Sequence, residues 1–222
     1  MNGFDEIEQT DREQFLLTIL RREVVHREET RKTRYLKTAG FYTLKTFEGY
    51  VFDEITFPSG FGPQELKTLD FLKDKRNIIM YGNVGTGKTH LATAIGVAAC
   101  RAGKRVRFYR TSALVNDLLD AKKGGTLQKI LKSFSKIDLL ICDEWGYVPL
   151  DRDGSRLLFQ VISECYERQS IIITTNLEFS KWVTIFYDQQ MTAAMIDRLV
   201  HHSYLLVFDG ESWRMKHSLI RS

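Results

Sequence analysis

The chain has 222 residues, of which 43% are hydrophobic and 12% aromatic, which is enough for one main domain with some chain left for an appendage. The first ten residues are polar and acidic, and no later apolar run approaches the length of a membrane span, so we expect a cytoplasmic protein rather than a secreted or membrane protein. Cys100, Cys142 and Cys165 each lie in a separate apolar stretch, which predicts reduced core residues. The net charge of +4 is too small to establish a polyanionic partner by itself.

The N-terminal region combines a helical apolar pattern with a dense run of basic residues. Apolar residues recur at helical spacing from Phe15 to Val24, and the pattern then continues to Lys37 as an almost wholly charged stretch. Between residues 21 and 45 there are eight Lys/Arg against three Glu, which indicates either a solvated helix face or a surface for DNA. We place a boundary near Thr46, between an N-terminal helical basic arm (1–45) and a main domain (46–222). The aromatic segment 39–62 is expected to form a strap across the domain surface.

Downstream of the arm, short runs rich in β-branched and aromatic residues alternate with longer helical windows. The candidate strands are Asn77–Tyr81, Arg105–Arg110, Ile137–Cys142, Ser170–Thr175 and Tyr204–Phe208. The candidate helices are Thr89–Ala102, Ser112–Lys122, Thr126–Phe134 and Arg152–Arg168. This alternation predicts an α/β fold with a five-stranded parallel sheet flanked by helices.

A glycine-rich segment follows the first candidate strand and precedes an alanine-rich helix. Its residues are Gly82, Asn83, Val84, Gly85, Thr86, Gly87, Lys88 and Thr89, followed by His90, and they satisfy the G-x-x-x-x-G-K-[ST] pattern of a Walker A motif. Glycine permits the backbone angles that turn successive amide groups towards a phosphate. We therefore expect this segment to bind ATP, with Lys88 at the β- and γ-phosphates and the Thr89 hydroxyl on Mg²⁺.

Acidic and amide side chains follow two of the other candidate strands. Asp143 and Glu144 end the apolar run that begins at Ile137, which is the form of a Walker B element. We expect Asp143 to hold the Mg²⁺ shell and Glu144 to polarise the water that attacks the γ-phosphate. Asn176 follows Ser170–Thr175, at a sensor position where its amide could orient that water; a plain asparagine turn after a strand is the alternative.

With these motifs in view, the chain resembles the IstB-like branch of the AAA+ ATPases, which are relatives of the DnaC-type helicase loaders. The segments that carry the resemblance are KTHLA at 88–92, DEWGY at 143–147, TTN at 174–176, IDRLVHHS at 196–203 and WRM at 213–215. They occur in the order that is typical of the family. The resemblance extends from Phe15 to the C-terminus.

This resemblance implies a P-loop NTPase fold in which the sensor strand lies between the Walker A and Walker B strands. It also implies assembly into a ring or spiral with ATP at subunit boundaries, where Arg198 would be the arginine finger. A surface ion pair with Asp197, or a charge at a helix end, is the alternative reading of Arg198. Arg214 is similar to the family's C-terminal sensor arginine, although we expect no C-terminal helical lid because few residues follow the last candidate strand.

The function implied by the resemblance is that of a transposition helper, an ATPase that oligomerises on duplex DNA and recruits or stimulates a transposase. A DnaC- or DnaI-type replicative helicase loader is the alternative with the same chemistry. A P-loop kinase for a small metabolite is disfavoured, because an acidic pair, a sensor asparagine and a separate arginine suit hydrolysis. A nucleotide-gated binding module with negligible turnover is disfavoured by the presence of Glu144.

Any contacts with DNA should be made mainly to phosphates, because the basic residues are clustered and no base-reading module is recognisable. The candidates, for which a solvated surface is an equal alternative, are Arg31, Lys32, Arg34, Lys122 and Lys123. No metal-ligand spacing is found around His90, His201 and His202, so these are expected to be packing or capping residues.

Overall fold

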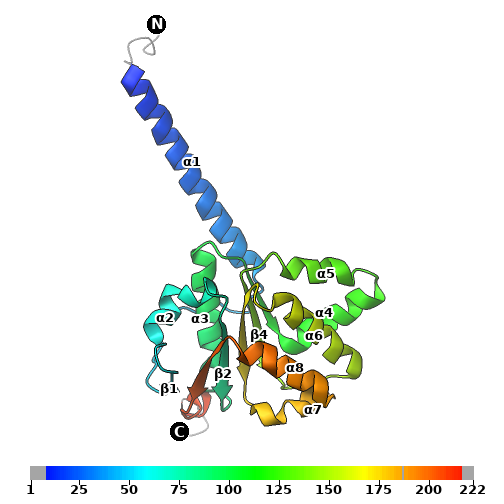
Figure 1. The fold of residues 1–222 in the computed structure, drawn as a ribbon. Coiled ribbons are helices and arrows are strands. Elements are labelled where there is room, and N and C mark those ends of the chain that lie inside the picture. The colour runs from blue at the N-terminus through cyan, green and yellow to red at the C-terminus, as the bar shows by residue number, and fades with distance from the viewer. Residues whose placement is uncertain (1–8, 187, 217–222) are drawn as a thin grey trace.

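The computed structural model describes residues 9–186 and 188–216, which form a layered body with one long helix projecting from it (Figure 1). This helix, α1, spans Gln9–Thr38 and therefore extends further at both ends than the helical pattern seen in the sequence. Within the described residues, no helix is both long and apolar enough to cross a membrane.

A six-stranded sheet forms the middle layer, with the order β1-β6-β2-β5-β4-β3. Its strands are β1 (Ile55–Thr56), β2 (Asn77–Gly82), β3 (Val106–Arg110), β4 (Leu139–Trp145), β5 (Ser170–Thr175) and β6 (Ser203–Phe208). All neighbouring strands are parallel except β1, which pairs antiparallel with β6. Because β5 lies between β2 and β4, the expected position of the sensor strand between the two Walker strands is confirmed.

Two details of the sheet differ from the sequence prediction. The sheet has six strands rather than five, because the two-residue β1 lies in the strap and is too short to produce a strand pattern. The sequence places the Walker B strand at 137–142, but β4 begins at Leu139 and continues to Trp145. The extension arises because Trp145 pairs with Thr175 of β5 after a register shift, so both acidic residues lie within the strand.

Helices cover both faces of the sheet (Figure 1). One face carries α2 (Pro63–Thr68), a 3-10 turn (Asp70–Leu72), α3 (Lys88–Arg101) and the last turns of α1. The other face carries α4 (Thr111–Lys123), α5 (Leu127–Phe134), α6 (Arg152–Cys165), a 3-10 turn (Phe179–Lys181), α7 (Val183–Phe186) and α8 (Gln189–Val200). A short helix, α9 (Trp213–Lys216), follows β6.

The central strands supply side chains to two separate cores. In β4, Leu139 and Ile141 pack on the α3 side, whereas Leu140 and Cys142 pack on the side of α4 to α8. All four side chains are fully buried, as expected for a parallel strand covered on both faces. The near-continuous apolar run before Asp143 is thus explained by burial on both sides of the sheet.

The three cysteines are free and buried, which confirms their prediction as core residues. Burial raises the pKa of the Cys100 thiol to about 11 and that of Cys165 to about 12. Since the reactive thiolate is disfavoured at both positions, these residues are suited to packing rather than to chemistry.

Candidate functional site

The loop between β2 and α3 depends on its glycines for its shape. Gly82, Gly85 and Gly87 have φ angles of +149°, +85° and +93°, a region that other residues rarely adopt. A Cβ atom on Gly82 would lie 2.3 Å from the carbonyl oxygen of Phe208, and one on Gly85 would lie 2.1 Å from Ser212 Oγ. Backbone conformation and close packing therefore both require glycine in this loop, as phosphate-binding loops do.

Lys88 begins α3 and lies back over the same loop. Its Nζ donates hydrogen bonds to the carbonyl oxygens of Gly82 (2.7 Å) and Asn83 (2.6 Å). The Asn83 carbonyl also accepts a hydrogen bond from the Thr86 hydroxyl at 2.8 Å. Because Lys88 is only 9% exposed, its positive charge is held where screening by water is weak and attraction to a phosphate is strong.

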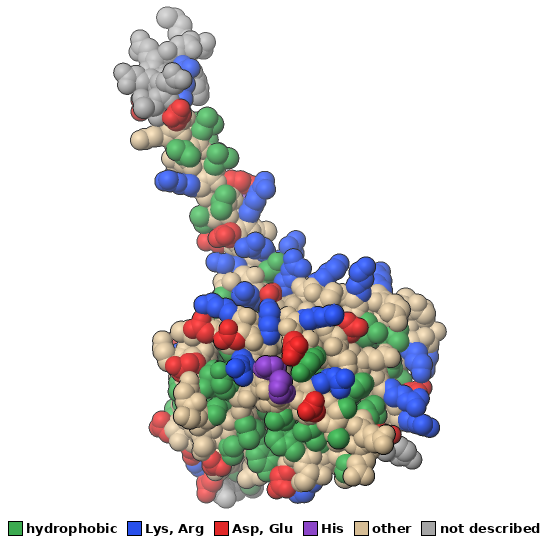
Figure 2. Space-filling view, viewed as in Figure 1, with side chains coloured by type: hydrophobic (Ala, Val, Ile, Leu, Met, Phe, Trp, Pro, Cys, Tyr) green, Lys and Arg blue, Asp and Glu red, His purple; other side chains and the backbone are tan. Residues whose placement is uncertain are grey.

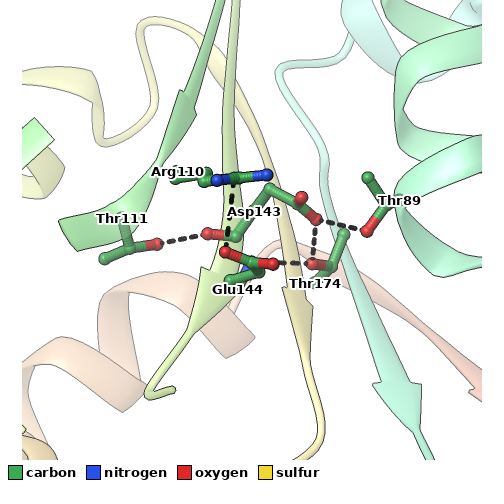
Figure 3. A network of polar contacts seen from close by, with 6 residues as sticks. All are labelled: Thr89, Arg110, Thr111, Asp143, Glu144 and Thr174. Carbon is green, nitrogen blue, oxygen red and sulfur yellow. Dashed lines mark hydrogen bonds and ion pairs between the residues drawn. The ribbon is translucent and has the colours of Figure 1, made fainter. Parts of the chain in front are cut away.

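Asp143 is the centre of a polar network at the carboxyl ends of β4 and β5 (Figure 3). Its Oδ1 accepts a hydrogen bond from the Thr89 hydroxyl at 2.9 Å and a second one from the Thr174 hydroxyl. Its backbone carbonyl accepts from the Thr111 hydroxyl at 2.9 Å. Asp143 is 2% exposed, so these three hydroxyl groups fix its orientation. The fold thus brings together Thr89 and Asp143, the two residues that the sequence analysis assigns to Mg²⁺.

Glu144, the other acidic residue, has a different environment. Its φ of +57° is unusual for a residue other than glycine, and it coincides with the register shift between β4 and β5. Its backbone amide donates to the Thr174 hydroxyl at 3.0 Å, while its carboxylate lies 3.5 Å from the Arg110 guanidinium (Figure 3). Arg110 in turn lies over the ring of Tyr42, with 4.6 Å between the guanidinium carbon and the ring centroid. The carboxylate of Glu144 is thus held towards β3.

A cleft of about 1090 Å³ brings these groups together. It is lined by the loop residues 84–90, by Arg110, Glu144 and Thr174 to Asn176 at the strand ends, by strap residues between 43 and 55, and by Glu211, Trp213 and Lys216 near the C-terminus. The volume is close to the upper end of the range of about 300–1,000 Å³ that is usual for small-molecule and cofactor sites.

The strap and the C-terminal segment close two sides of the cleft. Tyr50 Oη donates to the carbonyl oxygen of Gly87 at 3.3 Å, and burial raises the pKa of this phenol. The backbone amide of Trp213 donates to the Gly85 carbonyl at 3.0 Å. Lys216 pairs with Glu54 at 3.2 Å and so links the two segments. Both segments therefore contact the phosphate-binding loop directly.

His90 and Asn176 are two further predicted residues of the nucleotide site that line this cleft. His90 lines it, with Nε2 3.1 Å from the carbonyl oxygen of Thr46 and its ring 5.0 Å from that of Tyr50. Asn176 also lines the cleft and is exposed, as a residue in contact with water or ligand would be. The side chain of Arg214 lies outside the described residues.

Arg198 is in a different place from the other predicted catalytic residues. It belongs to α8 and lines a separate shallow depression with Tyr166, Ala194 and Asp197. Its guanidinium donates to the Ala194 carbonyl at 3.1 Å and lies 4.8 Å from the centre of the Phe159 ring. Arg198 is therefore not part of the cleft formed by its own chain.

The candidate DNA-contacting residues come from two elements. Arg31, Lys32 and Arg34 lie on the last third of α1, whereas Lys122 and Lys123 end α4. Lys122 forms an ion pair with Asp153 at 2.8 Å, and Lys123 one with Asp120 at 3.8 Å.

The residues of the site that the sequence does not predict include Arg110, Thr174 and Tyr50. A hydroxyl residue inside an apolar strand is a usable signal for Thr174, because such a residue needs a partner when buried. Arg110 and Tyr50 have no such signal, since they reach the cleft only through the packing of β3 and of the strap.

Comparison with known proteins identifies the fold and the family of the chain. The crystal structure of the DnaC helicase loader superimposes with a TM-score of 0.50 at 22% identity, covering 79% of this chain and 98% of that one, which supports the expected P-loop AAA+ fold. A protein of Sinorhizobium fredii, named for ATP binding in an insertion sequence, is 38% identical over 218 residues, or 96% of this chain and 73% of that protein. Its counterpart from insertion sequence IS21 of Pseudomonas aeruginosa is 38% identical over 206 residues, or 91% of this chain and 77% of that protein. The family model of IstB-like ATP binding proteins matches residues 5–220, and this chain belongs to that family.

Proposed function

We propose that this chain is an ATPase that hydrolyses Mg·ATP as the helper of a DNA transposition system. The observation that carries the proposal is the convergence of Lys88, Thr89 and Asp143 beneath a glycine-dependent loop. A hydroxyl and a carboxylate oxygen, already 2.9 Å apart, are ligands that suit Mg²⁺. Bound there, Mg²⁺ would neutralise charge on the phosphates, and Lys88 would exchange its loop carbonyls for phosphate oxygens.

Glu144 is the candidate general base for the attacking water. It lines the same cleft as the loop, and Asn176 lies two residues beyond Thr174, which bonds both acidic residues. In the present conformation the Glu144 carboxylate is paired with Arg110, so proton abstraction requires that pairing to loosen. We therefore propose that hydrolysis depends on the contact between Arg110, at the end of β3, and Glu144, near the end of β4.

The position of Arg198 supports action on a neighbouring subunit. Its side chain lines a depression outside its own cleft, so it can complete a site only if another copy of the chain presents a nucleotide to α8. A cation at the γ-phosphate stabilises the charge of the transition state. We therefore propose a ring or spiral in which ATP lies between subunits.

The distribution of basic residues supports duplex DNA as a partner. Lys and Arg side chains follow α1 and gather on the neighbouring end of the body (Figure 2). Contacts from such side chains are made to phosphates and carry little sequence preference. Lys122, Lys123 and Arg31 form ion pairs with acidic residues at 2.8, 3.8 and 3.8 Å, so Lys32 and Arg34 are the stronger candidates.

The relatives favour a transposase over a helicase as the protein partner. Those reported above are named for insertion sequences, which are mobile DNA elements, and they are 38% identical to this chain. The likeness to the DnaC helicase loader is one of fold, at 22% identity. A loader is therefore the second candidate.

The central test is ATP turnover with and without long duplex DNA, at low and moderate salt. We expect DNA to stimulate the wild type, Glu144→Gln to bind ATP without turning it over, and Arg198→Ala to lose about 10³-fold or more in rate. Lys73→Ala, which removes an exposed lysine paired with Asp70 away from the cleft, is the control and should behave as the wild type.

Mixing two inactive variants tests the shared site. Lys88→Ala keeps Arg198, and Arg198→Ala keeps the loop, so mixed rings should regain part of the activity that each variant lacks alone. Turnover that is indifferent to both DNA and Arg198 would overturn the DNA-bound ring and favour the loader, which would instead respond to a replicative helicase.

A further inference from the structure

Two histidines and a glutamate meet at the end of the sheet opposite the nucleotide cleft. Glu167 lies in the turn before β5, and His201 and His202 lie between α8 and β6. One potential ligand atom from each of the three residues lies within 4.8 Å of the others. These turns precede parallel strands, whereas the phosphate-binding loop follows β2, so the cluster and the cleft are at opposite ends. Figure 2 shows histidine side chains on the surface of the body, with acidic and basic side chains around them.

The strand between the two turns holds them in place. Asn77 begins β2, which lies between β5 and β6, and it is 6% exposed. Its backbone amide donates to the His202 carbonyl at 2.7 Å, and its Nδ2 donates to the Leu199 carbonyl at 3.2 Å. Its Oδ1 accepts from the amide of Ile171 at 2.9 Å. The buried side chain of Asn77 thus connects the end of α8 to the start of β5. The backbone positions of the two turns that carry the cluster are therefore fixed by the sheet.

The side chains already approach the spacing of metal ligands. His202 Nε2 lies 3.4 Å from Glu167 Oε1, and the two histidine rings are 4.3 Å apart. Ligands at about 2.0–2.1 Å around a tetrahedral ion are separated by roughly 3.4 Å. Glu167 and His201 are exposed, so the third ligand can close the remaining gap by small rotations.

Residues next to the cluster also favour metal binding. The Tyr166 hydroxyl lies 3.4 Å from His201 Nδ1, a contact that can orient the imidazole ring for ligation through its other nitrogen. Helix α6 ends at Cys165, three residues before the end at Arg168 that the sequence predicts. Glu167, in the turn that follows, has a left-handed φ of +56°. Two arginines close to the cluster in sequence contact other groups: Arg168 pairs with Glu164 at 3.6 Å, and Arg198 lies over the Phe159 ring.

We propose that Glu167, His201 and His202 form a binding site for a divalent transition-metal ion of the zinc class. Two imidazole nitrogens and one carboxylate oxygen suit Zn²⁺, Co²⁺ or Ni²⁺ and do not suit Mg²⁺ or Ca²⁺, which prefer oxygen ligands. Three protein ligands leave at least one coordination position for water or for a group from a partner. The site shares no residue with the nucleotide cleft of its own chain.

Titration calorimetry with Zn²⁺, in buffer containing a large excess of Mg²⁺, tests this site on the full chain. We expect one Zn²⁺ per chain and at least a tenfold loss of affinity in each of Glu167→Gln, His201→Ala and His202→Ala. His26→Ala, which removes a histidine of the exposed arm, is the matched control and should bind as the wild type. Circular dichroism of each variant checks that it is folded.

Bound Co²⁺ provides a second readout that does not depend on affinity. Its visible spectrum should indicate nitrogen and oxygen ligands and should change in the histidine variants. The proposal is overturned if the wild type binds no stoichiometric Zn²⁺, or if binding persists in a folded His201→Ala/His202→Ala double variant.

Discussion

Helices α1 and α3 differ in how far their apolar side chains are buried. In α3 the side chains of Leu91 and Ile95 are completely buried, whereas in α1 Phe15 and Leu20 are 58% and 60% exposed. It is the last turns of α1 that contact the body, where Tyr35 accepts a hydrogen bond from Arg105 Nε at 3.1 Å and packs against the core. A helix without tertiary contacts depends on its own propensity and local charge pairs, while a packed helix is held by burial.

This difference in burial suits the two helices to different functions. Because α3 is fixed by burial, it can hold Lys88 and Thr89 at its first turn in one geometry, as a catalytic site demands. The projecting α1 presents charged and apolar groups to the surroundings (Figure 2), which suits contact with another molecule.

The largest expected effect is on stability, from Leu91→Ala. Leu91 is fully buried in the core beneath β2, so its truncation leaves a cavity and should lower the free energy of unfolding by about 2–5 kcal/mol. Urea denaturation followed by circular dichroism measures this. A decrease of less than about 1 kcal/mol would show that α3 is held more by its loop than by its packing.

Lys88→Ala should have the next largest effect, on catalysis. Removing the ammonium that lies over the loop should lower ATP turnover about 10²–10³-fold, because a preorganised cation contributes on that scale at a charged transition state. Steady-state phosphate release gives the rate, with Lys73→Ala as the control. Unchanged turnover would remove α3 from the proposed mechanism.

A smaller effect is expected from combined substitution of Arg31, Lys32 and Arg34 by alanine. If these side chains neutralise DNA phosphates, the slope of log affinity against log salt should become shallower by about 0.9 for each phosphate that is no longer neutralised, with no change in sequence preference. Fluorescence anisotropy across a salt series measures the slope. Replacement of the exposed Lys67, Lys73 and Lys181 removes the same charge from the body and should leave the slope unchanged. Equal effects of the two triple variants would mean that only net charge matters.

The smallest effect is expected from Leu20→Ala, the counterpart of Leu91→Ala in the arm. Leu20 is 60% exposed, so the same substitution should change the free energy of unfolding by less than about 0.5 kcal/mol. The two variants can be compared in one urea series. A decrease of more than about 1 kcal/mol would indicate that α1 is packed against another copy of the chain in solution.

The residues of the nucleotide site that can be predicted are those whose relation is local in the chain. Gly82 to Thr89 form a single loop and helix start, so their spacing in the sequence is enough to predict that they lie together. Asp143 and Glu144 can be predicted because they end an apolar run, although the exact strand limits cannot, since the register shift against β5 depends on pairing.

Other features are decided only by tertiary structure. Arg110 reaches Glu144 because β3 pairs with β4, and Glu167 reaches His202 because β2 ties the starts of β5 and β6 together. The short strand β1 exists only because β6 offers it an edge. Such contacts join residues that are far apart in the chain, and they arise from strand order, register and packing. Local spacing contains no information about these, which is why histidines without a metal-binding pattern in the sequence can still meet a third ligand in the fold.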